Sequence, residues 1–86
     1  MKNNKTVIDV RTPAEFAGGS VVGSINIPLN EIEIHAAEIK QMQQPIVLCC
    51  ASGMRSGQAT AYLKNIGVDC ENGGSWIDVN YTINNN

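Results

Sequence analysis

Two adjacent cysteines, Cys49 and Cys50, precede a short run of small and polar residues that ends in an arginine and a serine. Residues 49–56 read CCASGMRS. A thiol that ionises to the thiolate is a strong nucleophile. A glycine such as Gly53 permits the positive φ or the close backbone approach that a tight loop needs. The stretch therefore predicts a loop built around a reactive thiolate.

This loop is expected to join a strand to a helix. Residues 46–49 are apolar throughout, as in a strand that is covered on both faces. Residues 56–66 carry apolar side chains at helical spacing. The N–H groups of the loop and of the first helical turn can converge on one point. Such a cradle holds an anion and favours the ionised form of a thiol at its centre.

The place of each cysteine relative to the strand separates their expected roles. Cys49 belongs to the apolar strand and is expected to pack in the core, as free cysteines often do. Cys50 is expected to be the first loop residue and to point into the cradle, which makes it the candidate nucleophile. The alternative for Cys50 is a buried thiol at the strand end. Cys70 lies in a predicted strand and is expected to be buried without a chemical role.

Short β-branched runs alternate with helical patterns along the chain. Thr12, Pro13 and Glu15 form the pattern of a helix start with a capping box. This alternation predicts a small three-layer α/β domain, with about four parallel strands flanked by helices on both faces. Ligands bind such sheets beyond the carboxyl ends of the strands. The expected strands are residues 7–10, 24–27, 46–49 and 68–71. Four helices are expected between and after them: one that begins at the cap Thr12, one over residues 30–43, one over residues 56–66, and one that begins at Ser75.

Composition restricts the class of protein. The 86 residues are expected to form a single domain, residues 1–86, with flexible ends at 1–5 and 82–86. The net charge of −2, with scattered basic residues, argues against a nucleic-acid partner. No apolar run is long enough to span a membrane. The polar N-terminus predicts a cytoplasmic location, or a periplasmic one if an export signal was removed.

No metal and no cofactor are expected. The three cysteines and His35, the single histidine, lack the paired spacing of a zinc site. His35 lies on a predicted helix away from the loop, and we expect it at the surface or the core edge without a functional role.

Four segments carry a family resemblance. They are residues 7–16 (VIDVRTPAEF), 23–28 (GSINIP), 50–56 (CASGMRS) and 71–74 (ENGG). In this order and spacing they resemble the single-domain rhodaneses, a thiosulfate sulfurtransferase-like family, and within it the small phage-shock protein E type. The chain departs from the family pattern at Ser20 and Val22, where histidine and proline are usual, and Trp76 is closer than usual to the double glycine.

The resemblance implies a rhodanese-like sheet and a six-residue active-site loop, residues 50–55, in which Cys50 carries a transient persulfide. It implies thiosulfate or a similar small anionic sulfur donor. The implied acceptor is cyanide in an assay, and a thiol or a thioredoxin-like protein in the cell. The hydroxyls of Ser52 and Ser56 can donate to a charged sulfur, although Ser56 can instead cap its helix. The candidate substrate-binding residues are Ala51, Ser52, Gly53, Met54, Arg55 and Ser56.

Two arginines have candidate structural roles. Arg55 either faces the loop mouth and attracts the anionic donor, or turns inward and braces the loop by pairing with Asp9. Arg11 is expected to tie a strand to a helix as structural support. Met54 and Trp76 are expected to pack, with lining of the pocket mouth as the alternative.

Two other functions compete with sulfur transfer. A phosphatase or arsenate reductase of related architecture places five residues between its cysteine and its arginine, which Cys49 and Arg55 match and Cys50 does not. Ser52, however, stands where the phosphatase pattern needs glycine, and the smaller ring from Cys50 suits a persulfide sulfur better than a phosphate. The other rival is a rhodanese-like module that relays sulfur or binds a protein partner without thiosulfate turnover.

Overall fold

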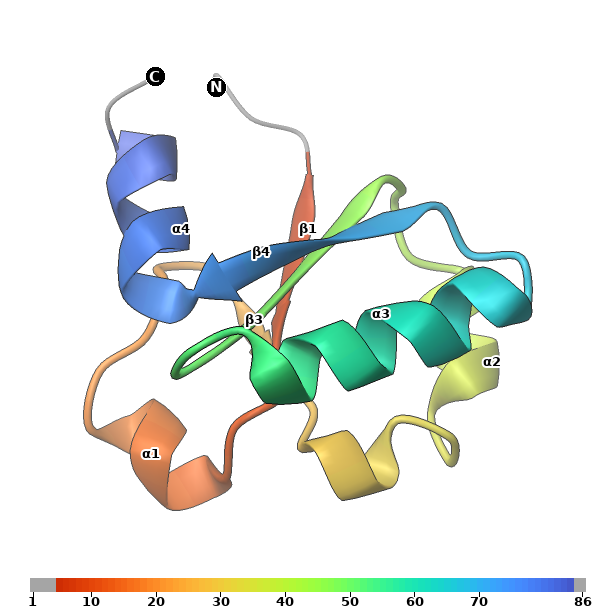
Figure 1. The fold of residues 1–86 in the computed structure, drawn as a ribbon, viewed down its shortest axis with the longest axis horizontal. Helices are drawn as coiled ribbons and strands as arrows, with labels where there is room; N and C mark the ends of the chain where they lie inside the picture. Colours follow the sequence, from red (N-terminus) through yellow and green to blue (C-terminus); the bar gives the residue numbers. More distant parts are fainter. Residues whose placement is uncertain (1–4, 85–86) are drawn as a thin grey trace.

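The structure is a computed structural model and describes residues 5–84. Four parallel strands form one sheet in the order β2-β1-β3-β4, with helices around it (Figure 1). The predicted fold class, a parallel four-stranded sheet flanked by helices, is confirmed. The elements in chain order are β1 (Thr6–Asp9), α1 (Pro13–Ala17), β2 (Ile25–Asn26), the 3-10 helix η1 (Leu29–Glu31), α2 (Ala36–Lys40), β3 (Ile46–Cys50), α3 (Met54–Asn65), β4 (Cys70–Ser75) and α4 (Trp76–Asn84).

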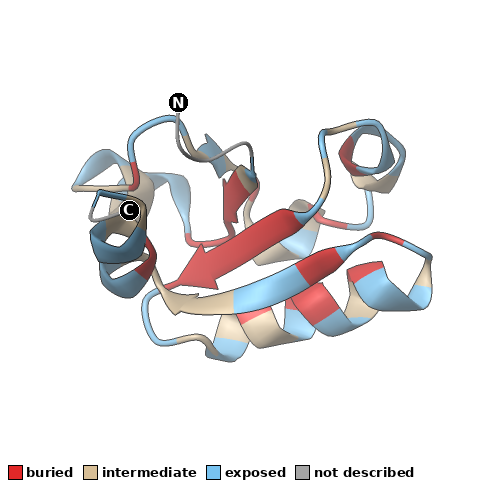
Figure 2. Cartoon of the chain, turned by 90° about the horizontal axis from the view of Figure 1, so that it is seen from above, coloured by how far each residue is buried: buried red, intermediate tan, exposed pale blue. Residues whose placement is uncertain are grey.

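The central strand β3 is buried along its whole length and divides the core into two clusters (Figure 2). Side chains alternate between the faces of a strand. Ile46, Leu48 and Cys50 therefore face the cluster that α2 and α3 complete. Cys49, together with Val47, faces the other cluster, to which α4 contributes Val79. The two adjacent cysteines consequently lie on opposite faces of the sheet.

Helix α1 begins with the predicted capping box. The Thr12 hydroxyl accepts the N–H of Glu15 at 3.2 Å, and the Glu15 carboxylate accepts the N–H of Thr12 at 3.0 Å. Pro13 occupies the first helical position, where its missing N–H leaves no unpaired donor. This local pairing fixes the orientation of the Glu15 carboxylate at the start of α1.

The predicted helix over residues 30–43 is wrong as a continuous element. The segment begins as η1, passes through turns and becomes the short helix α2. No side chain caps the start of η1 or of α2. The β-branched Ile32 and Ile34 also lose rotamer freedom in a helix. Burial of Ile32 and Ile39 holds the segment against the sheet without a regular helix between them.

Strand β4 begins and ends later than the predicted strand over residues 68–71. Gly67, with φ of 93°, turns the chain after α3, so that Val68 packs in the core and pairing with β3 starts at Cys70. The register shifts between Leu48 and Cys49 of β3, which leaves Gly73 as an extra residue opposite them. The double glycine predicted to follow the strand is therefore part of it.

Replacing Gly73 with alanine is expected to destabilise the fold by about 1–3 kcal/mol. An added Cβ would lie 2.6 Å from Val47 Cγ1 and 2.7 Å from Val79 Cγ2, so the core between β3 and α4 would have to expand. Urea unfolding measures the change. Gly18→Ala is the matched control, because φ is −78° there and the nearest atom to the new Cβ is 3.5 Å away. Equal stability of the two variants would contradict this packing.

The chain ends were expected to be flexible at 1–5 and 82–86. Residues 82–84 form the last turn of α4, and Lys5 pairs with Glu71 at 3.1 Å. Residues 1–4 and 85–86 lie outside the described residues, so that part of the prediction stays a prediction.

Candidate active site

Cys50 lies at the carboxyl end of β3, where the chain turns into α3. It still pairs with Ser75 of β4, so it is the last residue of the strand and not the first residue of the loop as predicted. It is also fully buried, with 0% of its surface exposed. Gly53, in the left-handed region with φ of 106°, turns the chain so that α3 begins at Met54, two residues earlier than predicted. The loop therefore folds back over the Cys50 side chain.

Three donors converge on the Cys50 sulfur. The backbone N–H of Gly53 lies 2.9 Å from Sγ, and the backbone N–H of Ser56 lies 3.5 Å from it. The Ser56 hydroxyl is the third, at 3.4 Å, although its single proton can be given either to Sγ or to Asn72 Oδ1, which lies 2.7 Å away. The Ser56 groups belong to the first turn of α3, whose N–H groups have no partner within the helix. The predicted cradle around Cys50 is thus present, with the sulfur at its centre.

The two adjacent cysteines differ sharply in acidity. Burial raises the pKa of Cys50, but hydrogen bonds from the Ser56 hydroxyl and from the N–H groups of Ser56, Gly53 and Ser52 outweigh it and lower the pKa to about 7. Burial, followed by the nearby Asp9 carboxylate, raises the pKa of Cys49 to about 12. Cys49 is packed in the core, as predicted. Near neutral pH only Cys50 has a substantial thiolate fraction.

The rate of Cys50 alkylation should rise with pH through an inflection near 7, because the thiolate is the reacting form. A measurement with iodoacetamide, followed by peptide mapping, reads this directly. In Ser56→Ala the inflection should move to higher pH, because one donor to the thiolate is lost. An inflection at or above about 8.5, the value of an ordinary thiol, would contradict an activated Cys50.

Asn72 of β4 links the loop, α3 and the strand, and the sequence did not single it out as a site residue. Its Nδ2 donates to the Gly53 carbonyl at 3.0 Å. Its Oδ1 accepts the Ser56 hydroxyl at 2.7 Å and the Gly74 N–H at 3.0 Å. Asn72 therefore positions two of the residues that contact Cys50. Its place in the 71–74 segment was the available signal, but nothing in the sequence indicated which groups it would meet.

Arg55 does not form the predicted brace with Asp9, and its predicted role at the loop mouth stays a prediction. Its guanidinium forms a two-pronged pair with Glu15 of α1, at 2.8 Å and 3.0 Å, and not with Asp9. The hydrogen bond from Arg55 is the main cause that lowers the pKa of Glu15 to about 2. The capping box and this pair use the same carboxylate, so Glu15 connects the start of α1 to the start of α3.

Asp9 pairs instead with Arg11, two residues along the chain, in a buried arrangement. Arg11 Nη2 lies 2.7 Å from Asp9 Oδ2, and Nε lies 3.0 Å from both carboxylate oxygens. Arg11 also donates to the Gly19 carbonyl at 2.6 Å, and its guanidinium carbon lies 4.9 Å from the centre of the Trp76 ring. Arg11 is thus the predicted structural support, and Trp76 packs against it and the α4-side core.

The outer side of the loop is formed by small or uncharged side chains. Ala51 and Ser52 are exposed, and the Ser52 hydroxyl accepts the N–H of Met54 at 3.5 Å rather than reaching the sulfur. Met54 is 75% exposed, so its predicted packing role is wrong. Ser56 is the third residue of α3 and does not cap the helix. Of the two predicted hydroxyl donors to the sulfur, only Ser56 is in contact with it.

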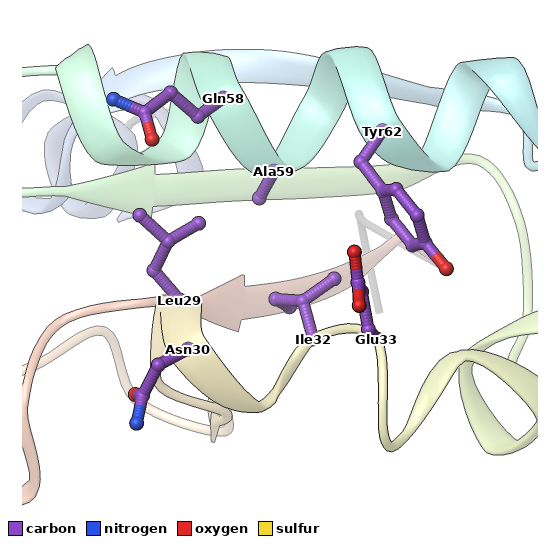
Figure 3. Close-up of a pocket in the computed structure, with 7 residues that line it drawn as sticks. All are labelled: Leu29, Asn30, Ile32, Glu33, Gln58, Ala59 and Tyr62. Carbon is purple, nitrogen blue, oxygen red and sulfur yellow. The ribbon is translucent and has the colours of Figure 1, made fainter.

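Other reactive or hollow regions lie outside the loop. Cys70 is buried as predicted, with its thiol 3.7 Å from the Thr60 carbonyl, and His35 is partly exposed as predicted and pairs with Glu38. A cavity of about 270 Å³ separates η1 from α3 (Figure 3), and none of its lining residues belongs to the Cys50 loop.

Within residues 5–84 no cluster of three or more His, Cys, Asp or Glu side chains could hold a metal ion. None of the described helices has the length and apolar character needed to cross a membrane.

Comparison with known protein families and structures shows which proteins this chain resembles. The model of the rhodanese-like domain matches residues 1–76. A sulfurtransferase of Allochromatium vinosum is 41% identical over 61 residues, which are 71% of this chain and 56% of that protein. Thiosulfate sulfurtransferase PspE of Escherichia coli is 36% identical over 74 residues, which are 84% of this chain and 71% of that protein.

A solved structure, a rhodanese with anions from Escherichia coli, has a TM-score of 0.77 and 34% identity, over 86% of this chain and 89% of that chain. The chain spans about half the length of some of the curated relatives that it matches. The domain match nevertheless covers most of the chain, and the parallel sheet agrees with the solved structure of that family. The chain belongs to the family of rhodanese-like domains.

Proposed function

We propose that this protein is a sulfurtransferase that moves a sulfane sulfur from thiosulfate or a similar donor to a thiophilic acceptor through a persulfide on Cys50. The observation that carries the proposal is the convergence of the Gly53 and Ser56 donors on one sulfur whose pKa is lowered to about 7. Relatives named as sulfurtransferases support the same reaction class.

The chemistry takes two displacement steps. The Cys50 thiolate attacks the outer sulfur of thiosulfate, a bond forms between Sγ and that sulfur, and sulfite leaves with the electron pair of the broken S–S bond. The acceptor then attacks the outer sulfur of the persulfide and restores the Cys50 thiolate. Cyanide gives thiocyanate in this step. No general base is required, because Cys50 is partly ionised at neutral pH.

The loop must move for the donor to reach the sulfur, because Cys50 is fully buried. Ala51 and Ser52 of this loop are short and exposed, so a shift of the loop disturbs little packing. After transfer the outer sulfur carries the charge, and we expect the N–H groups of the loop, of which those of Gly53 and Ser56 contact Sγ, to stabilise it.

The geometry favours sulfur transfer over phosphatase chemistry. The phosphatase spacing to Arg55 requires Cys49 as nucleophile, and Cys49 faces the α4 side of the sheet with a pKa raised to about 12. Arg55, which would bind the phosphate, is held by Glu15. The loop from Cys50 to Arg55 is one residue shorter than a loop from Cys49 to Arg55. Its hydrogen-bond donors converge on a single atom, the Cys50 sulfur.

Incubation with thiosulfate alone should leave the intact protein heavier by one sulfur atom, because the cradle stabilises the persulfide. Cyanide should remove that mass, and peptide mapping should place it on Cys50. Mass spectrometry makes both measurements. Loading on Cys70 instead, or no loading at all, would contradict the assignment.

Repeated turnover separates an enzyme from a sulfur relay. An enzyme should form thiocyanate well beyond one equivalent when thiosulfate and cyanide are in excess, whereas a relay domain that needs a protein partner should stop near one. A phosphatase assay on the same preparation should show no activity that depends on Cys49.

A further inference from the structure

Every cation at the Cys50 edge of the described sheet is already paired with a carboxylate. Arg55 is held by both oxygens of Glu15, and Arg11 is held by both oxygens of Asp9. A further carboxylate, Asp78, lies in the first turn of α4 directly after β4. Acidic groups therefore balance or exceed basic ones at this edge.

The remaining described cations lie away from the loop. Lys5 precedes β1 and pairs with Glu71. Lys40 ends α2, and the chain then enters β3 at the end opposite Cys50. Lys64 is in the last turn of α3, nine residues after Arg55, or about 14 Å along the helix axis. In the described part of the chain, the loop mouth thus has no lysine or arginine close by that is not already matched by a carboxylate.

We propose that Glu15, by holding Arg55, makes the Cys50 site prefer a sulfane donor with a single negative charge over dianionic thiosulfate; this preference rests on the proposed function. The donor class comprises organic thiosulfonates and persulfides. Glu15 is then a residue that determines donor specificity without touching the reacting sulfur.

The physical reason lies in the cost of bringing charge to the loop. In the Born description the desolvation cost of an ion grows with the square of its charge, so a dianion costs about four times as much as a monoanion of equal size. Backbone N–H groups offset the cost for one charge, but a second charge needs a cation. The thiolate of Cys50 also repels a dianion more strongly than a monoanion. With Arg55 held by Glu15, a monoanion is the better match.

Arg55 is close enough to the sulfur to change this balance. It is the second residue of α3, directly beside Ser56, which contacts Sγ. The Glu15 hydrogen bond is the main cause that raises the pKa of Arg55, and the charge of Cys50 raises it further. Releasing Arg55 from Glu15 would therefore place an unpaired guanidinium at the donor's approach.

Thiosulfate and methanethiosulfonate are a matched pair of probes. Both deliver an outer sulfur to the Cys50 thiolate, and the broken S–S bond releases sulfite from one and methanesulfinate from the other. They differ by one unit of charge. The quantity to measure is the ratio of kcat/KM for thiosulfate to kcat/KM for methanethiosulfonate, with cyanide as acceptor.

Glu15→Gln should raise this ratio on the order of tenfold, and added salt should reduce the increase. Glutamine can keep the capping box with Thr12, so α1 is preserved while the ion pair is lost. Glu71→Gln is the matched control, because it removes an equal charge from an ion pair outside the loop, and its ratio should equal that of the wild type.

The Arg55→Gln variant tests the donor preference from the other partner of the ion pair. It leaves the Glu15 carboxylate unpaired at the mouth, so the ratio should fall below that of the wild type. An unchanged ratio in Glu15→Gln, or an equal loss with both donors, overturns the preference and leaves sulfur transfer intact. Failure of both donors to load Cys50 in the wild type would instead refute the proposed function.

Discussion

Cys50→Ser is expected to abolish sulfur transfer from every donor while the protein remains folded. A hydroxyl cannot form a persulfide and stays protonated at neutral pH, so both the nucleophile and the sulfur carrier are lost. Serine is slightly smaller than cysteine and can still meet the donors from Gly53 and Ser56, which keeps the loop in place. Thiocyanate formation measures the activity, and circular dichroism with urea unfolding confirms the fold.

Cys49→Ala is the matched control on the opposite face of the sheet. Most activity should remain, because Cys49 contacts the α4-side core and not the loop. Stability should fall by about 1 kcal/mol, as for the loss of a small buried side chain. A folded but inactive Cys49→Ala protein would show that both thiols take part, and would revive the phosphatase spacing or a two-cysteine relay.

Arg11→Met should cause the largest loss of stability among single substitutions near the site, about 3–5 kcal/mol. The Asp9 carboxylate is fully buried, and its side-chain cation partner is Arg11. Removing that partner leaves a buried charge with only the backbone N–H of residue 11 to compensate it. A small domain has a total stability of about 5–15 kcal/mol, so a midpoint shift in urea will be large.

Two further variants separate the buried charge from lost packing. Asp9→Asn combined with Arg11→Met removes both charges and should recover part of the stability. Glu71→Gln breaks an exposed pair and should change stability by only about 0–1 kcal/mol. If the double variant is no more stable than Arg11→Met alone, the contacts of Arg11 with Gly19 and Trp76 carry the loss.

Local patterns in the sequence were sufficient for several features. The capping box of Thr12 and Glu15 forms within one turn, so its residues determine it without help from the rest of the chain. The burial of Cys49 followed from its place in an apolar strand, although Cys50 was expected in the loop and is the last residue of that strand. A glycine three residues after Cys50 was enough to predict a loop whose N–H groups turn toward the sulfur. The candidate nucleophile could be named because each of these interactions is local.

Partners from distant parts of the chain were not predictable in the same way. The predicted order of strands and loops suggested that Arg55 would lie either beside Asp9 or at the loop mouth. In the structure its ion pair is with Glu15 of α1, a residue that the sequence pattern did not bring near it. Asn72 acquires its role because β4 pairs with β3 and packs beside α3, which brings the Asn72 amide to Ser56 and Gly53.

The secondary structure of the segment after Pro28 also could not be predicted from local sequence alone. Its apolar spacing fits a helix, but burial of Ile32 and Ile39 against the sheet overrides a weak local preference. The sequence by itself therefore indicated which atom is the proposed nucleophile and what surrounds it within a few residues. The tertiary structure alone decided which carboxylate holds Arg55 and which amide orients Ser56, because those contacts join residues 40 and 16 positions apart in the chain and depend on how the elements pack.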